Sequence, residues 1–166
     1  MPTEEIVRLA GVTRGALYHH FRDKRDLFLA VFEDAQREIA ERIATEADRA
    51  SDPWDQLLAG CRAFLEACTD PRLQQIVVID APAVLGWDVW RQVDARNGLT
   101  QLKLGLSELQ DAGVLETHSI DALAHLLSGA MNEAALWVAQ SDDQESALEE
   151  AMETLATLLQ SIRIGP

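Results

Sequence analysis

The side chains that could perform chemistry are scattered along this 166-residue chain rather than gathered into a catalytic motif. His118 and His125 are seven residues apart, too far to share a metal ion on one helix. Paired carboxylates such as Asp142 and Asp143 lie in polar stretches typical of a solvated surface. No HExxH, CxxC, GxSxG or phosphate-loop pattern occurs. The sequence therefore predicts no enzyme activity, no metal site and no cofactor.

The two cysteines, Cys61 and Cys68, are also seven residues apart. On one helix their Cα atoms would be separated by about 10 Å, which exceeds the separation of about 7 Å that a disulfide can bridge. We therefore expect two buried thiols that pack as small hydrophobic side chains.

A binding function is indicated near the N-terminus. Apolar residues between 4 and 10 predict a short helix, which Gly11 ends. Thr13 is placed to cap a second helix that runs to about Phe21. Two short helices joined by a glycine-containing turn form a helix-turn-helix, whose second helix enters the major groove of DNA. Arg14, near the start of that helix, can donate two hydrogen bonds to guanine.

Neighbouring side chains can add contacts to DNA. Gly15 would let the backbone approach DNA or a neighbouring helix closely. Tyr18, His19 and Lys24 can each donate a hydrogen bond to a phosphate oxygen, as can Thr13. The spacing alone admits another hypothesis, in which Tyr18 packs in the core and the polar side chains are merely solvated.

The net charge of −14 argues at first against nucleic acid, but the charges are unevenly distributed. Residues 8–25 hold five cations against one anion, whereas residues 51–166 hold six cations against eighteen anions. A basic head on an acidic body would be drawn to phosphate at one end and repelled at the other.

The elements that must position these residues are all predicted to be helices. Apolar residues recur at three- and four-residue spacing through most of the chain, which predicts an all-α fold of about eight helices. Asp23 and Ser119 are expected N-caps. One uninterrupted helix is expected over about 87–112, after a kink or turn over 80–86. We find neither a stretch long and apolar enough to span a membrane nor an export signal, so we expect a cytoplasmic protein.

Residues 5–27, EIVRLAGVTRGALYHHFRDKRDL, closely resemble the signature of the TetR family of transcriptional regulators. The most specific parts are the Ala-Gly-Val turn at 10–12, the run Gly-Ala-Leu-Tyr-His-His-Phe at 15–21, and Lys24. The likeness covers roughly residues 3–32. The remaining residues resemble the family in helical layout alone.

The resemblance implies a partial helix-turn-helix domain with its connecting helix at 1–47, and a ligand-binding and dimerisation domain at 48–166. The residues that would bind phosphates are Thr13, Tyr18, His19 and Lys24. Those that would face the bases are Arg14, Gly15 and His19. The last two helices, about 119–140 and 146–162, would form the interface of a homodimer. The chain would then be a repressor of double-stranded operator DNA that a small-molecule effector releases.

An effector pocket needs mostly apolar walls and a few placed polar groups. The candidate wall residues are Phe64, Trp87, Trp90, Met131 and Trp137. The candidate polar anchors are His125 and Asn132. For each tryptophan the alternative is an ordinary core position, and for His125 it is a core or dimer-interface position.

One departure from the family bears on function. Family members begin with a further helix that packs beneath the helix-turn-helix, whereas this sequence starts essentially at the second helix. The apolar side formed by Ile6, Leu9, Leu17 and Phe21 would then lack its usual cover, so we expect this form to bind DNA poorly or not at all. The alternative function is a dimeric ligand-binding or interaction module on a TetR-like fold that has lost DNA binding.

Overall fold

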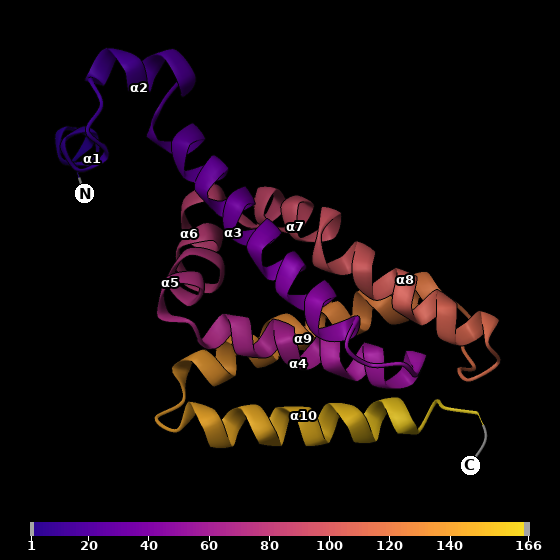
Figure 1. The fold of residues 1–166 in the computed structure, drawn as a ribbon. Helices are drawn as coiled ribbons and strands as arrows, with labels where there is room; N and C mark the ends of the chain where they lie inside the picture. Colours follow the sequence, from indigo (N-terminus) through magenta and orange to yellow (C-terminus); the bar gives the residue numbers. More distant parts are fainter. Residues whose placement is uncertain (1, 165–166) are drawn as a thin grey trace.

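The computed structural model describes residues 2–164 and is predominantly helical (Figure 1). The elements in chain order are α1 (Thr3–Ala10), α2 (Arg14–His20), α3 (Lys24–Ala47), α4 (Pro53–Thr69), α5 (Pro71–Leu73), the π-helical segment η1 (Gln74–Asp80), α6 (Ala81–Leu85), α7 (Trp87–Arg96), α8 (Gly98–Asp111), α9 (Ile120–Gln140) and α10 (Gln144–Gln160). Within the described residues there is no strand, only an isolated antiparallel bridge between Leu115 and Arg163. None of the described helices combines the length and apolar character needed to cross a bilayer. The expected all-α fold is confirmed.

Local side-chain chemistry sets where the helices begin. Thr13 Oγ1 accepts from Ala16 N at 3.1 Å, and Asp23 Oδ1 accepts from Asp26 N at 2.8 Å. Ser119 Oγ accepts in the same way from the backbone at the start of α9. Each bond satisfies an amide that the first turn of a helix leaves without a partner. The three N-caps expected from the sequence are therefore confirmed.

The single helix expected over 87–112 is wrong, because the chain breaks between α7 and α8 at Asn97. Asn97 has φ −111° and ψ −91°, and its side-chain Nδ2 donates to Val93 O at 2.8 Å. An asparagine that bonds the preceding turn in this way competes with the helical ladder. The two halves can therefore point in different directions.

The turn expected over 80–86 contains a short helix, α6, and a π-helical segment precedes it. In η1 the amide of Ala81 bonds to Ile76 O, five residues back. The next carbonyl in that register, Val77 O, would need the amide of Pro82, and proline has none. The indole Nε1 of Trp90 donates to Val77 O at 3.0 Å instead. Trp90 therefore completes the backbone hydrogen bonding of a neighbouring segment.

The buried apolar residues form two clusters that share α4. The first cluster joins α3 to the segments between α4 and α8, and its members are Phe32, Ala35, Ile39, Ala67, Leu73, Val77, Ala81, Leu85, Trp90 and Val93. The second joins α4 and α8 to α9 and α10 and includes Leu65, Leu106, Leu109, Leu127, Met131, Leu155 and Leu159. Helix α3 is thus held by the first cluster, while α9 and α10 belong to the second.

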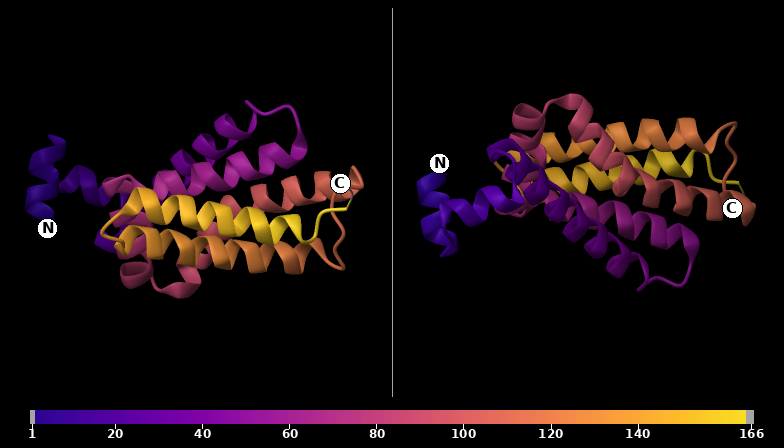
Figure 2. Two further views of the ribbon diagram at one scale, coloured as in Figure 1. Left: turned by 90° about the horizontal axis from the view of Figure 1, so that it is seen from below. Right: turned by 90° about the horizontal axis from the view of Figure 1, so that it is seen from above.

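Helices α1 and α2 lie apart from both clusters, at the N-terminal end of α3 (Figures 1 and 2). No described residue of either helix is buried. Gly11 makes the turn between them in the left-handed conformation, φ +66°, which a residue with a side chain adopts only with strain. The first turn of α3 is anchored to the body by Arg25, whose Nη2 donates to Leu85 O at 2.7 Å. The head therefore connects to the body through α3 and this contact.

Candidate functional site

The residues expected to contact DNA all lie in or beside α2, at the end of the molecule farthest from α10 (Figure 1). All six are exposed, namely Thr13, Arg14, Gly15, Tyr18, His19 and Lys24. The alternative hypothesis of a core tyrosine at 18 does not hold, because Tyr18 is among the exposed large side chains. Arg14 forms an ion pair with Glu4 at 3.1 Å and lies over the Tyr18 ring at 5.6 Å. Both charged groups are well exposed, so this pair contributes little to stability.

Gly15 is not required by the packing of α2. A Cβ atom placed there would meet only Thr13 Oγ1, at 3.9 Å, which is an ordinary contact. Glycine costs a helix up to about 1 kcal/mol relative to alanine. No contact within the described residues requires a glycine at this position, so the lost helix stability is not compensated by packing. The space beside Gly15 is therefore open to a molecule outside the chain.

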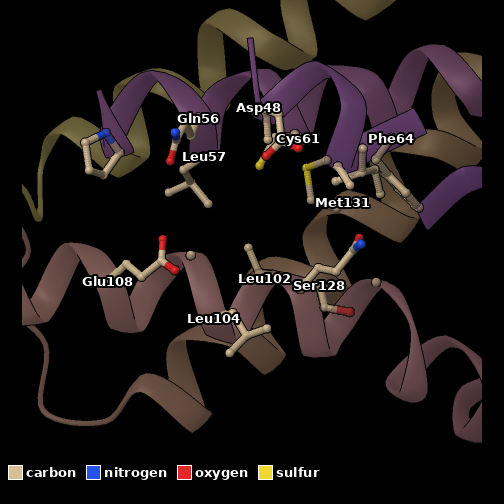
Figure 3. Close-up of a pocket in the computed structure, with 18 of the residues that line it drawn as sticks. Asp48, Gln56, Leu57, Cys61, Phe64, Leu102, Leu104, Glu108, Ser128 and Met131 are labelled. Atoms are coloured by element: carbon tan, nitrogen blue, oxygen red, sulfur yellow. The ribbon is translucent and has the colours of Figure 1, made fainter. Parts of the chain in front are cut away.

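A second site lies in the body, where a cavity of about 270 Å³ opens between α3 and α4 on one side and α8 and α9 on the other (Figure 3). Its lining residues are Ile43, Ala44, Ala47, Asp48, Pro53, Gln56, Leu57, Gly60, Cys61, Phe64, Asp94, Gly98, Gln101, Leu102, Leu104, Gly105, Glu108, Ser128, Met131 and Asn132. Most of the wall is apolar, with a few polar groups, as in sites that hold small organic molecules.

A buried polar cluster forms one wall of the cavity. Asp94 is only 3% exposed, and Arg91 donates to its carboxylate and also to Ser128 Oγ, the latter at 2.9 Å. Asn132 Nδ2 donates to the same carboxylate at 3.5 Å. Burial raises the pKa of Asp94 above its usual value, while Arg91 and Asn132 act in the opposite direction. The cluster ties α7 to α9 beside the space that a ligand would occupy.

The structure brings three of the seven candidate ligand residues to this cavity: Phe64, Met131 and Asn132. Trp90 is buried in the first cluster, and Trp87 stacks on it with ring centroids 4.9 Å apart while remaining exposed. His125 and Trp137 are exposed on α9. These four residues lie outside the cavity.

Sequence reasoning missed the remaining lining residues, and two signals were available for them. Asn97 and Gly98 are adjacent, and this pair marks a turn more often than a helix interior. Asp94 follows Trp90 and Val93 on the same face of α7, so a carboxylate stands where an apolar residue is expected. The other lining residues of α8, including Gln101 and Glu108, carry no local signal, because the bend between α7 and α8 brings them to α3 and α4.

The two cysteines are free and buried, as the spacing predicted. Cys61 lines the cavity, while Cys68 packs in the second cluster. Burial raises the pKa of each thiol to about 12, so almost no thiolate is present at neutral pH.

We expect that neither thiol reacts with Ellman's reagent within minutes in the folded protein at pH 7.5, because the thiolate is the nucleophile. Both should react at once in guanidinium chloride. The variants Cys61→Ala and Cys68→Ala would assign any signal to one residue. Rapid release of one equivalent of the thiol chromophore from the folded protein would contradict the expectation.

An apolar face of α9 has no partner within the described chain. Leu126 is 73% exposed and Trp137 is 47% exposed, and Ala122, Gly129 and Ala130 are exposed between or beside them. Ala122, Leu126, Gly129 and Ala130 lie three or four residues apart and Trp137 lies seven residues beyond Ala130, so these positions share one face of the helix, which also carries the exposed Glu133. Leu158 is exposed on α10, which lies beside α9 (Figure 2). Contiguous exposed apolar surface is typical of surfaces that contact another molecule.

Comparison with known proteins gives consistent matches at both ends of the chain. Residues 1–31 match the family model of bacterial regulatory proteins, tetR family, and residues 54–162 match that of the tetracyclin repressor-like C-terminal domain. The transposon Tn10 TetC protein of Escherichia coli is 26% identical over 126 residues, which are 76% of this chain and 64% of TetC. The HTH-type transcriptional regulator AcrR of Shigella flexneri is 46% identical over 54 residues, which are 32% of this chain and 25% of AcrR. The chain therefore spans less than two thirds of either relative.

A crystal structure of a TetR-family transcriptional regulator from Pectobacterium atrosepticum superposes with a TM-score of 0.86 at 35% sequence identity. The alignment covers 100% of this chain and 85% of that chain. The likeness therefore extends over the helix-turn-helix and the body together.

Proposed function

Because this chain belongs to the TetR family of bacterial regulatory proteins, we propose that it is a repressor that binds operator DNA as a homodimer and leaves it when a small molecule enters the body. The observation that carries the proposal is the course of α3. Its N-terminal end holds the helix-turn-helix, and its C-terminal end supplies Ile43, Ala44 and Ala47 to the cavity. One continuous helix thus joins the two sites.

The DNA contacts in this proposal are those of α2 and the start of α3. Arg14 and Gly15 would face the bases, and the phosphate contacts would come from Thr13, Tyr18, His19 and Lys24. The exposure of all six residues supports this assignment, as does the open space beside Gly15. Among the ligand candidates, the cavity supports Phe64, Met131 and Asn132.

The homodimer in this proposal forms through α9 and α10. Two copies of the apolar face around Leu126 and Trp137 would cover each other about a two-fold axis, which is the commonest symmetry of soluble oligomers. A dimer also places two recognition helices for the half-sites of a palindromic operator.

Fluorescence anisotropy with the DNA upstream of the gene and a scrambled duplex tests the proposal. We expect Arg14→Ala to weaken binding to the cognate duplex about tenfold or more, since a bidentate contact to guanine is worth about 1–3 kcal/mol. Binding of the scrambled duplex should change far less. Lys24→Ala should weaken both duplexes alike and lower the slope of log affinity against log salt by about one.

Arg49→Ala is the matched control, because Arg49 is an exposed arginine beyond the C-terminal end of α3 and should leave both affinities unchanged. Equal effects of Arg14→Ala on both duplexes would remove that residue from base recognition.

A second candidate function, the dimeric ligand-binding or interaction module without DNA binding, is favoured by one observation. No described residue of α1 or α2 is buried, so this head has little packing energy of its own. A folded dimer that binds a ligand but does not distinguish the two duplexes at low salt would support the module.

A further inference from the structure

Three amide side chains line the cavity, and each directs its nitrogen to an acceptor of the protein. The bonds run from Gln56 Nε2 to Ala50 O at 2.8 Å, from Gln101 Nε2 to Ala40 O at 3.1 Å, and from Asn132 Nδ2 to Asp94 Oδ2 at 3.5 Å. Backbone carbonyls and carboxylates accept hydrogen bonds and do not donate them, so these partners fix which end of each amide is the nitrogen.

The amide oxygens are consequently left as acceptors. Among residues 2–164, none donates a hydrogen bond to the side-chain oxygen of Gln56, Gln101 or Asn132. The Gln101 oxygen is itself buried and without a partner. The oxygens of Gln56 and Asn132 are not among the buried unpartnered atoms, so a molecule in the cavity that brings an N–H group to them gains a hydrogen bond.

The charges around the cavity have one sign. Asp48 follows α3, Glu108 lies on α8, and Asp94 belongs to the buried cluster; all three line the space. The lining residues include no lysine, arginine or histidine. Arg91 pairs with Asp94, but within the described part of the chain neither Asp48 nor Glu108 has an ion-pair partner. Figure 3 shows Glu108 and Gln56 on opposite sides of the same opening.

We propose that the cavity binds a small apolar molecule that carries a protonated amine. Its N–H groups donate to the amide oxygens of Gln56 and Asn132. Its positive charge is attracted by Asp48 and Glu108, and its hydrocarbon part contacts Leu57, Phe64 and Met131. An anion of the same shape would face Asp48 and Glu108, which have no ion-pair partner among the described residues. A neutral hydrocarbon would leave the accessible amide oxygens unpaired. This inference rests on the proposed function, because it names the chemical class of the effector.

Isothermal titration calorimetry with three matched probes tests the charge preference. The probes are 4-phenylbutylamine, the neutral hydrocarbon pentylbenzene and the anion 5-phenylpentanoate. An alkylamine is fully protonated at pH 7.5, as lysine is. We expect the amine to bind at least tenfold more tightly than the hydrocarbon, and the anion not to bind measurably. Equal affinities, tighter binding of the anion, or no binding of the amine would overturn the proposal.

Charge-neutral variants locate the preference in the cavity. Asp48→Asn and Glu108→Gln should each weaken binding of the amine about threefold, since both carboxylates are partly screened by solvent, and should leave binding of the hydrocarbon unchanged. The matched controls are Glu41→Gln on α3 and Asp111→Asn on α8, which are exposed carboxylates outside the cavity. Equal losses in the controls would assign the effect to the net charge of the protein and would overturn the proposal.

Operator binding on the same preparation separates this inference from the proposed function. Selective binding of the cognate duplex, together with no preference for the amine, would support the proposed regulator and reject amines as the class of its effector. Preference for the amine without any selective DNA binding would support the proposed amine site in the cavity and reject the proposed function as a DNA-binding regulator.

Discussion

Replacing Phe32 with alanine is expected to lower the free energy of unfolding by about 3–5 kcal/mol, the range found for large aromatic side chains removed from a core. Phe32 is 0% exposed and belongs to the cluster that packs α3 against η1, α6 and α7. Its removal leaves a void in that cluster, because the surrounding helices can only partly collapse into it. Urea denaturation followed by circular dichroism, at one fixed protein concentration, measures the change.

Val31→Ala is the matched control. Val31 is the preceding residue of α3 and is 40% exposed, so its truncation should cost less than about 1 kcal/mol. A loss below about 1 kcal/mol for Phe32→Ala, similar to that of the control, would show that the cluster does not hold α3 in solution.

Replacing Leu126 with glutamate is expected to raise the dissociation constant of the proposed homodimer about 100-fold or more. Leu126 is the most exposed apolar residue of the α9 face, and two-fold symmetry would bring its copies into one interface. Two carboxylates would then be desolvated with like charges close together, which costs several kcal/mol. A dilution series in sedimentation velocity measures the dissociation constant.

Val84→Glu is the control for the dimer experiment, because Val84 is an exposed apolar residue of α6, away from α9 and α10. Its dissociation constant should match that of the unmodified protein. If Leu126→Glu stays dimeric across the same dilution series, the subunits associate through another surface.

The features of the fold that the sequence predicts well are those set by residues adjacent in sequence. The hydrogen bond that the Ala16 amide donates to the Thr13 hydroxyl oxygen requires only that segment, and so do the cap at Ser119 and the turn at Gly11. The break at Asn97 was missed because helical periodicity continues through it, while the signal for a turn is a single dipeptide.

The candidate site could be predicted only in part, because a cavity is defined by residues that meet from distant segments. Phe64 and Met131 were found by their apolar character and Asn132 by its position among apolar neighbours. Gln101 and Glu108 look like any polar residue of a solvated helix. The angle between α7 and α8 brings α8 to α3 and α4, where Gln101 donates to Ala40 O. Trp90 was predicted to line the pocket because of its residue type, but it lies elsewhere. Its indole Nε1 donates to Val77 O, the carbonyl that Pro82 leaves without a backbone partner.

If the proposed effector acts by tilting α3 about Phe32, this helix would behave as a lever with an internal fulcrum, and the hydrogen bond from Arg25 to Leu85 O would have to lengthen or break. Lys24 is eight residues from Phe32 in one direction, and Ile43 is eleven residues away in the other. At 1.5 Å per residue the two arms measure about 12 Å and about 16 Å. A ligand that pushes the Ile43 end outward by about 1 Å would therefore swing the Lys24 end by about 0.7 Å in the opposite sense, and the helices beyond it farther. In a dimer the two levers move by symmetry, so the separation of the recognition helices changes by up to twice the displacement of each.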